Sequence, residues 1–108
     1  MANSFKNYFL KNANTTSQNV YAAGTGVQAT LIGMTIANIT AAPISANVTI
    51  TSGGTSYFMV QGATIASGGS LVPIGGDQKV VLEAGDYLQV QTTAANSADV
   101  ILSVLEIT

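Results

Sequence analysis

Short runs of alternating apolar and polar residues, separated by glycine, asparagine, serine and proline, make up the chain from about residue 20 onward. The clearest run spans residues 44–51, where Ile44, Ala46, Val48 and Ile50 alternate with serine, asparagine and threonine. This period of two is typical of a β-strand with one buried face. Residues 52–55 (Ser-Gly-Gly-Thr) accept the positive φ angles of a tight turn, which predicts a hairpin with a second strand at residues 56–61.

Residues 27–38 are apolar on both faces, which predicts a central strand that is covered on both sides for part of its length. Gly33 and the β-branched residues around it disfavour a helix. Further strands are predicted at residues 70–74, 79–82, 87–93 and 99–108. Turns separate them at residues 75–77 and 83–86. In the second turn Gly85 suits the left-handed position, and Asp86 can bond to the backbone.

The spacing of these runs, about 8 to 12 residues, is that of sandwiches and barrels. With 108 residues there is room for one core. We therefore expect an all-β fold, an antiparallel β-sandwich of jelly-roll type with about eight strands, over residues 20–108. Residues 1–19 form either an extended N-terminal arm or the first strand. Their apolar side chains, Phe5, Tyr8, Phe9 and Leu10, are candidates for an interface.

The composition favours association with other proteins. Only 7% of the residues are charged while 47% are hydrophobic, and the formal net charge is -2, so little repulsion opposes contacts between copies. We expect a homo-oligomer. Lys6, Lys11 and Lys79 form no basic cluster, so nucleic acid is not an expected partner. The chain has no continuous apolar stretch that fits a secretory signal or a bilayer span, so neither export by that route nor a membrane partner is expected.

The sequence lacks the side chains on which most catalysis depends. Histidine and cysteine are absent, which removes the commonest general base and the thiol nucleophile. Asp77, Glu83 and Asp86 are close in sequence, but they lie in or beside glycine turns and lack the ligand spacing of a calcium loop. Gly68-Gly69 and Gly75-Gly76 lack the remainder of a phosphate-binding motif. We expect no enzyme activity, no catalytic residues, no cofactor and no metal.

Two segments carry a resemblance to a known group of proteins. They are residues 75–88 (GGDQKVVLEAGDYL) and residues 97–106 (SADVILSVLE), and the opening residues 1–7 and residues 36–40 also fit. With these the chain resembles the small β-sandwich virion proteins of tailed bacteriophages, particularly marine phages. The resemblance implies a structural protein present in many copies, located in the virion after assembly in the host cytoplasm. Decoration or cementing of the capsid is the first expectation.

Other positions in the particle and another class of function stay open. The resemblance also fits a component of the head–tail neck or of the tail, so the expected partners are capsid, neck or tail subunits. The resemblance assigns no functional residues to this chain. The alternative class is a receptor- or carbohydrate-binding module, with Tyr21, Tyr57 or Tyr87 as stacking surfaces beside asparagine and glutamine donors. The sequence has no tryptophan and few aromatic residues, so a binding module ranks below a structural protein.

Overall fold

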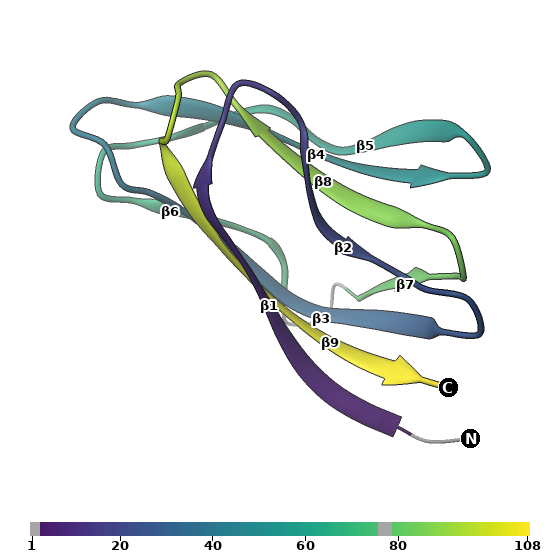
Figure 1. The fold of residues 1–108 in the computed structure, drawn as a ribbon. Helices are drawn as coiled ribbons and strands as arrows, with labels where there is room; N and C mark the ends of the chain where they lie inside the picture. The colour runs from purple at the N-terminus through teal and green to yellow at the C-terminus, as the bar shows by residue number, and fades with distance from the viewer. Residues whose placement is uncertain (1–2, 76–78) are drawn as a thin grey trace.

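Two antiparallel β-sheets pack face to face in the computed structural model, which describes residues 3–75 and 79–108 (Figure 1). The described residues form nine strands and no helix, and therefore no helix that could cross a bilayer. The strands are β1 (Asn3–Ala13), β2 (Gln18–Ala22), β3 (Gln28–Asn38), β4 (Ile44–Ser52), β5 (Thr55–Ile65), β6 (Ser70–Ile74), β7 (Val80–Leu82), β8 (Tyr87–Thr92) and β9 (Ala98–Ile107).

The strand order is that of a jelly roll. One sheet has the order β1-β9-β3-β6, with β7 also paired to β3, and the other has the order β2-β8-β4-β5. The chain crosses repeatedly from one sheet to the other, and β6 and β7 together occupy the position beside β3. This confirms the predicted antiparallel sandwich. The strand that the sequence did not predict separately is β2, which has five residues.

The predicted turns are present where they lie within the described residues. Gly53 and Gly54 connect β4 and β5 with φ angles of 60° and 82°, which a side chain would strain. Gly85 has a φ angle of 92°, and the Asp86 carboxylate accepts a hydrogen bond of 3.0 Å from the backbone nitrogen of Glu83. The other predicted turn includes Gly76 and Asp77, which lie outside the described residues.

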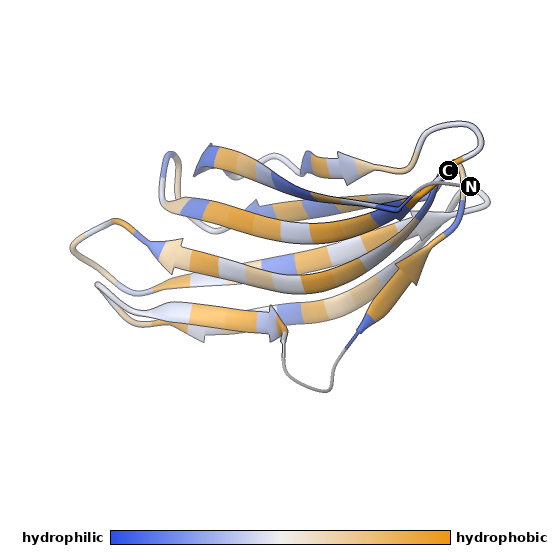
Figure 2. Cartoon of the chain, turned by 90° about the horizontal axis from the view of Figure 1, so that it is seen from below, coloured by the Kyte–Doolittle hydropathy of each residue, from blue (hydrophilic) through white to orange (hydrophobic). Residues whose placement is uncertain are grey.

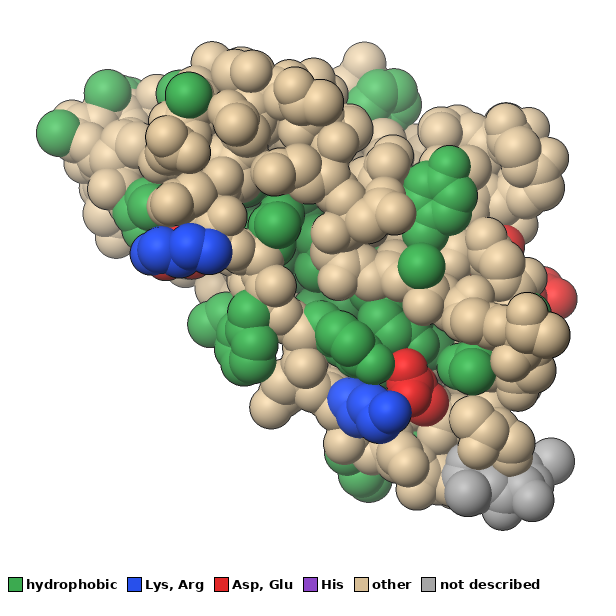
Figure 3. All heavy atoms as spheres, viewed as in Figure 1, with side chains coloured by type: hydrophobic (Ala, Val, Ile, Leu, Met, Phe, Trp, Pro, Cys, Tyr) green, Lys and Arg blue, Asp and Glu red, His purple; other side chains and the backbone are tan. Residues whose placement is uncertain are grey.

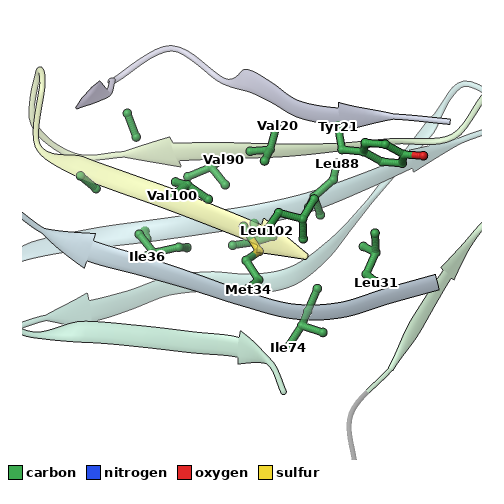
Figure 4. Packing of buried hydrophobic residues seen from close by; sticks show 14 of the residues in the cluster. Val20, Tyr21, Leu31, Met34, Ile36, Ile74, Leu88, Val90, Val100 and Leu102 are labelled. Atoms are coloured by element: carbon green, nitrogen blue, oxygen red, sulfur yellow. The ribbon is translucent and has the colours of Figure 1, made fainter. Parts of the chain in front are cut away.

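The core lies between the sheets and consists of alternate residues of their strands. Hydropathy bands alternate along the ribbons in Figure 2, as the period of two predicts. Figure 4 shows Met34, Ile36, Val100 and Leu102 of one sheet in the same layer as residues of the other. The largest fully buried apolar side chains are Leu31, Met34, Ile36, Val48, Ile74, Leu82, Leu88, Val90, Val100, Leu102 and Val104.

Strand β3 differs from its prediction. Its inner face is buried and its outer face is half-exposed, so it is not covered on both sides. Leu31 pairs with Val104 and Gly33 pairs with Ser103, which leaves Ile32 as an extra residue in the ladder. This β-bulge changes the parity of the strand, so Leu31 and Met34 both face the core. This change of parity explains why the sequence of the segment looks apolar on both faces.

The N-terminal residues form the first strand in this single chain. Strand β1 pairs with β9 in unbroken antiparallel register from Asn3, opposite Ile107, to Leu10, opposite Val100. The register shifts before Ala13, where Asn12 has a φ angle of 58°. Of the two predicted alternatives, the strand is therefore the one that this structure contains, and β1 belongs to the sandwich.

Truncation of a core residue of β9 should strongly destabilise the fold. Leu102 is fully buried, so Leu102→Ala should lower the free energy of unfolding by about 3 kcal/mol, through lost apolar burial and the remaining cavity. Its neighbour Ile101 is 49% exposed, so Ile101→Ala is the matched control and should cost less than about 1 kcal/mol. Urea unfolding followed by circular dichroism measures both. Equal losses would contradict the inward direction of Leu102.

Candidate protein-binding surface

The four predicted interface residues do not share one surface, because successive side chains of a strand point to opposite faces. Phe5 and Phe9 lie on the outer face of β1 and are 78% and 68% exposed. Tyr8 and Leu10 face the sandwich and pack against the core. Of the four candidates, Tyr8 and Leu10 are therefore partly buried within their own chain, and Phe5 and Phe9 are the two that face outward.

Phe5 and Phe9 belong to a larger apolar surface on the outside of the β1-β9-β3 sheet. Phe5 lies opposite Leu105 of β9, and Phe9 lies opposite Ile101. Ile32, the bulged residue of β3, also has a half-exposed side chain. We call these five residues, Phe5, Phe9, Ile32, Ile101 and Leu105, the outer strip. An exposed apolar surface of this kind is typical of a contact site.

The outer strip is uneven, because a hollow lies beside each phenylalanine. One, of about 290 Å³, is lined in part by Phe5, Asn7, Ile32 and Ser103. The Ser103 hydroxyl donates a hydrogen bond of 3.0 Å to Oδ1 of Asn7. The other, of about 210 Å³, is lined in part by Phe9 and Ile101 and by the Lys11–Asp99 pair. These two hollows can receive protruding side chains of another protein.

Both lysines of β1 are paired with acidic residues of β9, Lys11 on the outer face and Lys6 on the inner face. Lys11 Nζ lies 2.9 Å from Asp99 Oδ2, and Lys6 Nζ lies 3.1 Å from Glu106 Oε1. Figure 3 shows two lysine side chains, each beside an acidic one, with hydrophobic side chains between them. The Lys11 bond and the bond from the Asn12 backbone nitrogen hold the pKa of Asp99 below its usual value. The surface therefore carries little local net charge to repel another protein.

Glu106 is the centre of a partly buried polar cluster that joins three strands. Its Oε2 accepts hydrogen bonds of 2.6 Å from Tyr21 of β2 and 3.0 Å from Tyr8 of β1. Its Oε1 faces Lys6, and the two tyrosine rings are 4.7 Å apart. Since each partner lies on a different strand from Glu106, the cluster fastens the edge strands β1 and β2 to β9.

The cluster fixes the protonation states of its members. The Tyr21 hydrogen bond, with those from Lys6 and Tyr8, outweighs burial and lowers the pKa of Glu106. Burial, followed by the hydrogen bond to Glu106, raises the pKa of Tyr21 and of Tyr8. The Glu106 hydrogen bond raises the pKa of Lys6. At neutral pH the cluster therefore consists of a carboxylate, an ammonium group and two phenols.

The Glu106 cluster was not predicted, although the sequence contains one signal for it. Glu106 continues the inward alternation of Val100, Leu102 and Val104, and an acidic residue at a core position must have polar partners. Its partners are 85 to 100 residues distant in sequence, so they become known only with the topology.

The remaining candidates form no recognisable reactive site. Glu83 is exposed, Asp86 bonds to the turn backbone, and Asp77 lies outside the described residues. Within residues 3–75 and 79–108, no group of three acidic side chains could hold a metal ion. Of the tyrosines considered for sugar stacking, Tyr21 is buried and Tyr87 is half-buried, so Tyr57, at 58% exposure, is the one open to solvent.

Comparison with known proteins gives a neighbour in structure. No protein-family model and no curated protein matches the sequence. Six solved chains match in structure, among them a Bacillus endospore appendage protein described as one of a novel family of disulfide-linked pili. The two folds align with a TM-score of 0.59 over 98% of this chain and 88% of the other, at 18% identity. The similarity establishes a shared fold. The resemblance to phage virion proteins stays an expectation from the sequence.

Removing the charge of Glu106 should destabilise the fold in a pH-dependent way. Glu106→Gln weakens the charge-assisted hydrogen bonds and should cost about 2 kcal/mol at neutral pH. Because folding lowers the pKa of Glu106, its stabilisation is present above the unfolded pKa and is lost as the pH falls through the folded pKa. The difference between wild type and variant should therefore shrink below about pH 4.

Urea unfolding at a series of pH values measures this effect. Glu83→Gln is the matched control, because Glu83 is an exposed turn residue, and it should change the stability by less than about 0.5 kcal/mol. A difference for Glu106→Gln that stays constant from neutral to acidic pH would contradict the assigned role of the carboxylate.

Proposed function

We propose that this chain is a non-enzymatic structural subunit that joins copies of itself or related proteins in a larger assembly. The observation that carries the proposal is the outer strip, in which Phe5 and Phe9 are 78% and 68% exposed. Isolated exposed apolar residues are common on monomeric proteins. Here two phenylalanines lie on one face of a regular strand, Phe5 beside Leu105 and Phe9 beside Ile101, so their apolar side chains gather on the same side of the sheet.

The outer strip offers enough apolar area to contribute to binding. The exposed parts of the two phenylalanine rings amount to about 300 Å², and covering them would contribute several kcal/mol before the entropic cost of association. Contacts of this type depend little on salt, unlike ion pairs at a surface. A nearly uncharged sandwich with such a surface is suited to permanent packing against neighbouring subunits.

The structural neighbour supports a role in assembly without fixing its form. That protein is described as an appendage protein of disulfide-linked pili and has the same fold. The present sequence contains no cysteine, so its copies would associate through non-covalent contacts. The finer proposal is a component of a tailed-phage virion that decorates the capsid, with a position in the neck or tail as the second choice. It rests on the sequence resemblance and on the low charge.

Replacing the two phenylalanines should abolish assembly while the fold persists. For the double variant Phe5→Ser and Phe9→Ser we expect light scattering to give the monomer mass at concentrations where the wild type is oligomeric. Circular dichroism should still show β-structure, because both side chains are exposed. The double variant Tyr57→Ser and Phe58→Ser is the matched control, since it removes two aromatic side chains, each 58% exposed, from the other sheet.

The control should assemble as the wild type does. Loss of assembly in the control alone would move the contact surface to β5, and a wild type that stays monomeric at high concentration would contradict the proposal. Negative-stain electron microscopy of the wild type separates the two forms of assembly. Closed oligomers of fixed size agree with capsid decoration, whereas filaments of the pure chain would favour an appendage.

A further inference from the structure

The free edge of β1 is the longest regular sheet edge that the described residues leave unpaired. Strand β1 ends its sheet, and its eight residues from Asn3 to Leu10 pair with β9 without interruption, while their other side has no strand. The remaining edges are protected. Strand β2 is short and bulged, β6 contains Pro73, β7 has three residues, and two register shifts interrupt β5. Short strands, bulges and proline prevent an edge from pairing with another chain.

The outer face of β1 has a nearly palindromic sequence. Its residues are Asn3, Phe5, Asn7, Phe9 and Lys11, which give the order Asn-Phe-Asn-Phe-Lys. We propose that two copies of the chain join by antiparallel pairing of their β1 strands about a twofold axis at Asn7. This inference deepens the proposed structural function and rests on it, because it names a second copy as the partner at this edge.

The proposed register pairs compatible side chains on both faces of the extended sheet. On the outer face Phe5 lies opposite Phe9 of the second copy, twice, and Asn7 lies opposite Asn7. On the inner face Lys6 lies opposite Tyr8 of the second copy. Aromatic pairs directly opposite each other stabilise antiparallel strands, and an ammonium group beside a tyrosine ring is also favourable. The interface is isologous, as a twofold axis requires.

The two neighbouring registers, with the axis at Lys6 or at Tyr8, are worse. A twofold axis at Lys6 would set the two Lys6 ammonium groups opposite each other, which destabilises a sheet. An axis at Tyr8 would set Phe5 opposite Lys11 and Phe9 opposite Asn7, so that no phenylalanine would face another. The register at Asn7 uses all nine residues from Asn3 to Lys11 and pairs every phenylalanine with a phenylalanine.

Pairing of the two edges would also enlarge the outer strip. The β1-β9-β3 sheets of both copies would become one continuous sheet, with two phenylalanine pairs on one face, one on each side of the Asn7 pair. The dimer would present to a third protein a doubled apolar surface that neither copy has alone. The edge contact and the outer strip share Phe5 and Phe9, so the double serine variant tests both, whereas a substitution at Asn7 tests the register of the edge contact alone.

A cysteine at the twofold axis tests the register directly, because the wild-type chain has no cysteine. In the proposed dimer the two side chains at position 7 lie opposite each other, with Cβ atoms about 5 Å apart. Asn7→Cys should therefore give a covalent dimer with a short bismaleimide, in high yield at concentrations where the wild type is oligomeric. Thr64→Cys, on the exposed part of the β5 edge, is the matched control and should react as a monomer.

A charge at the same position should weaken the dimer. Asn7→Asp retains an acceptor for the Ser103 hydroxyl but sets two carboxylates opposite each other, so the dissociation constant should rise about threefold to fivefold at low salt. Added salt should reverse most of this rise. Thr64→Asp adds the same charge on β5 and should leave the constant unchanged.

The outcomes separate this inference from the proposed function. An oligomeric wild type whose Asn7→Cys variant forms no covalent dimer would overturn pairing at Asn7 and leave assembly through the outer strip intact. Equal yields for Asn7→Cys and Thr64→Cys would also overturn it, because they indicate random collision. A wild type that is monomeric at every concentration would overturn both.

Discussion

Strand β9 is apolar on both faces, but a single sandwich can bury only one of them. Val100, Leu102 and Val104 fill the core on its inner face, whereas Ile101 and Leu105 lie on the outer face. Strand β1 adds Phe5 and Phe9 to the same outer face. The described residues therefore bury apolar side chains between the two sheets and leave other apolar side chains exposed on the outside, where a second molecule can cover them.

The few charges of the chain are arranged in agreement with this constraint. Lys6 and Lys11, both on β1, are held by Glu106 and Asp99 of β9, so each lysine is neutralised by the neighbouring strand. The Glu106 cluster lies on the inner side of the sheet, where it fastens β1 and β2, so the charge of Glu106 is kept away from Phe5 and Phe9. A stable edge and an outer surface with little net charge thus arise from the same pairs.

Local signals in the sequence were sufficient for most of the fold. Alternation identified β4 and β8, and the glycines at positions 53, 54 and 85 marked turns that require positive φ angles. Strand β2 was missed because it has only five residues and a register shift between Asn19 and Tyr21 interrupts its alternation, so that Val20 and Tyr21 are both buried. The bulge at Ile32 made both faces of β3 look apolar, and its signal in the sequence was the adjoining Gly33, because an isolated glycine within a strand often marks a bulge.

The candidate surface was predicted less completely than the fold. The sequence identified the aromatic residues of the first segment, but its period of two already implied that Tyr8 and Leu10 would face away from Phe5 and Phe9. The neighbours of the phenylalanines, Ile101 and Leu105, lie more than 90 residues distant and depend on the pairing of β1 with β9. Long-range partners of this kind follow from topology, which local patterns do not determine.

Sedimentation velocity of the wild-type chain over a wide range of concentrations tests most directly whether the outer face is a contact surface. The account predicts that the weight-average sedimentation coefficient rises with concentration and that moderate salt does not suppress the rise, because the contact is apolar. A coefficient that stays at the monomer value up to the highest soluble concentration would contradict it.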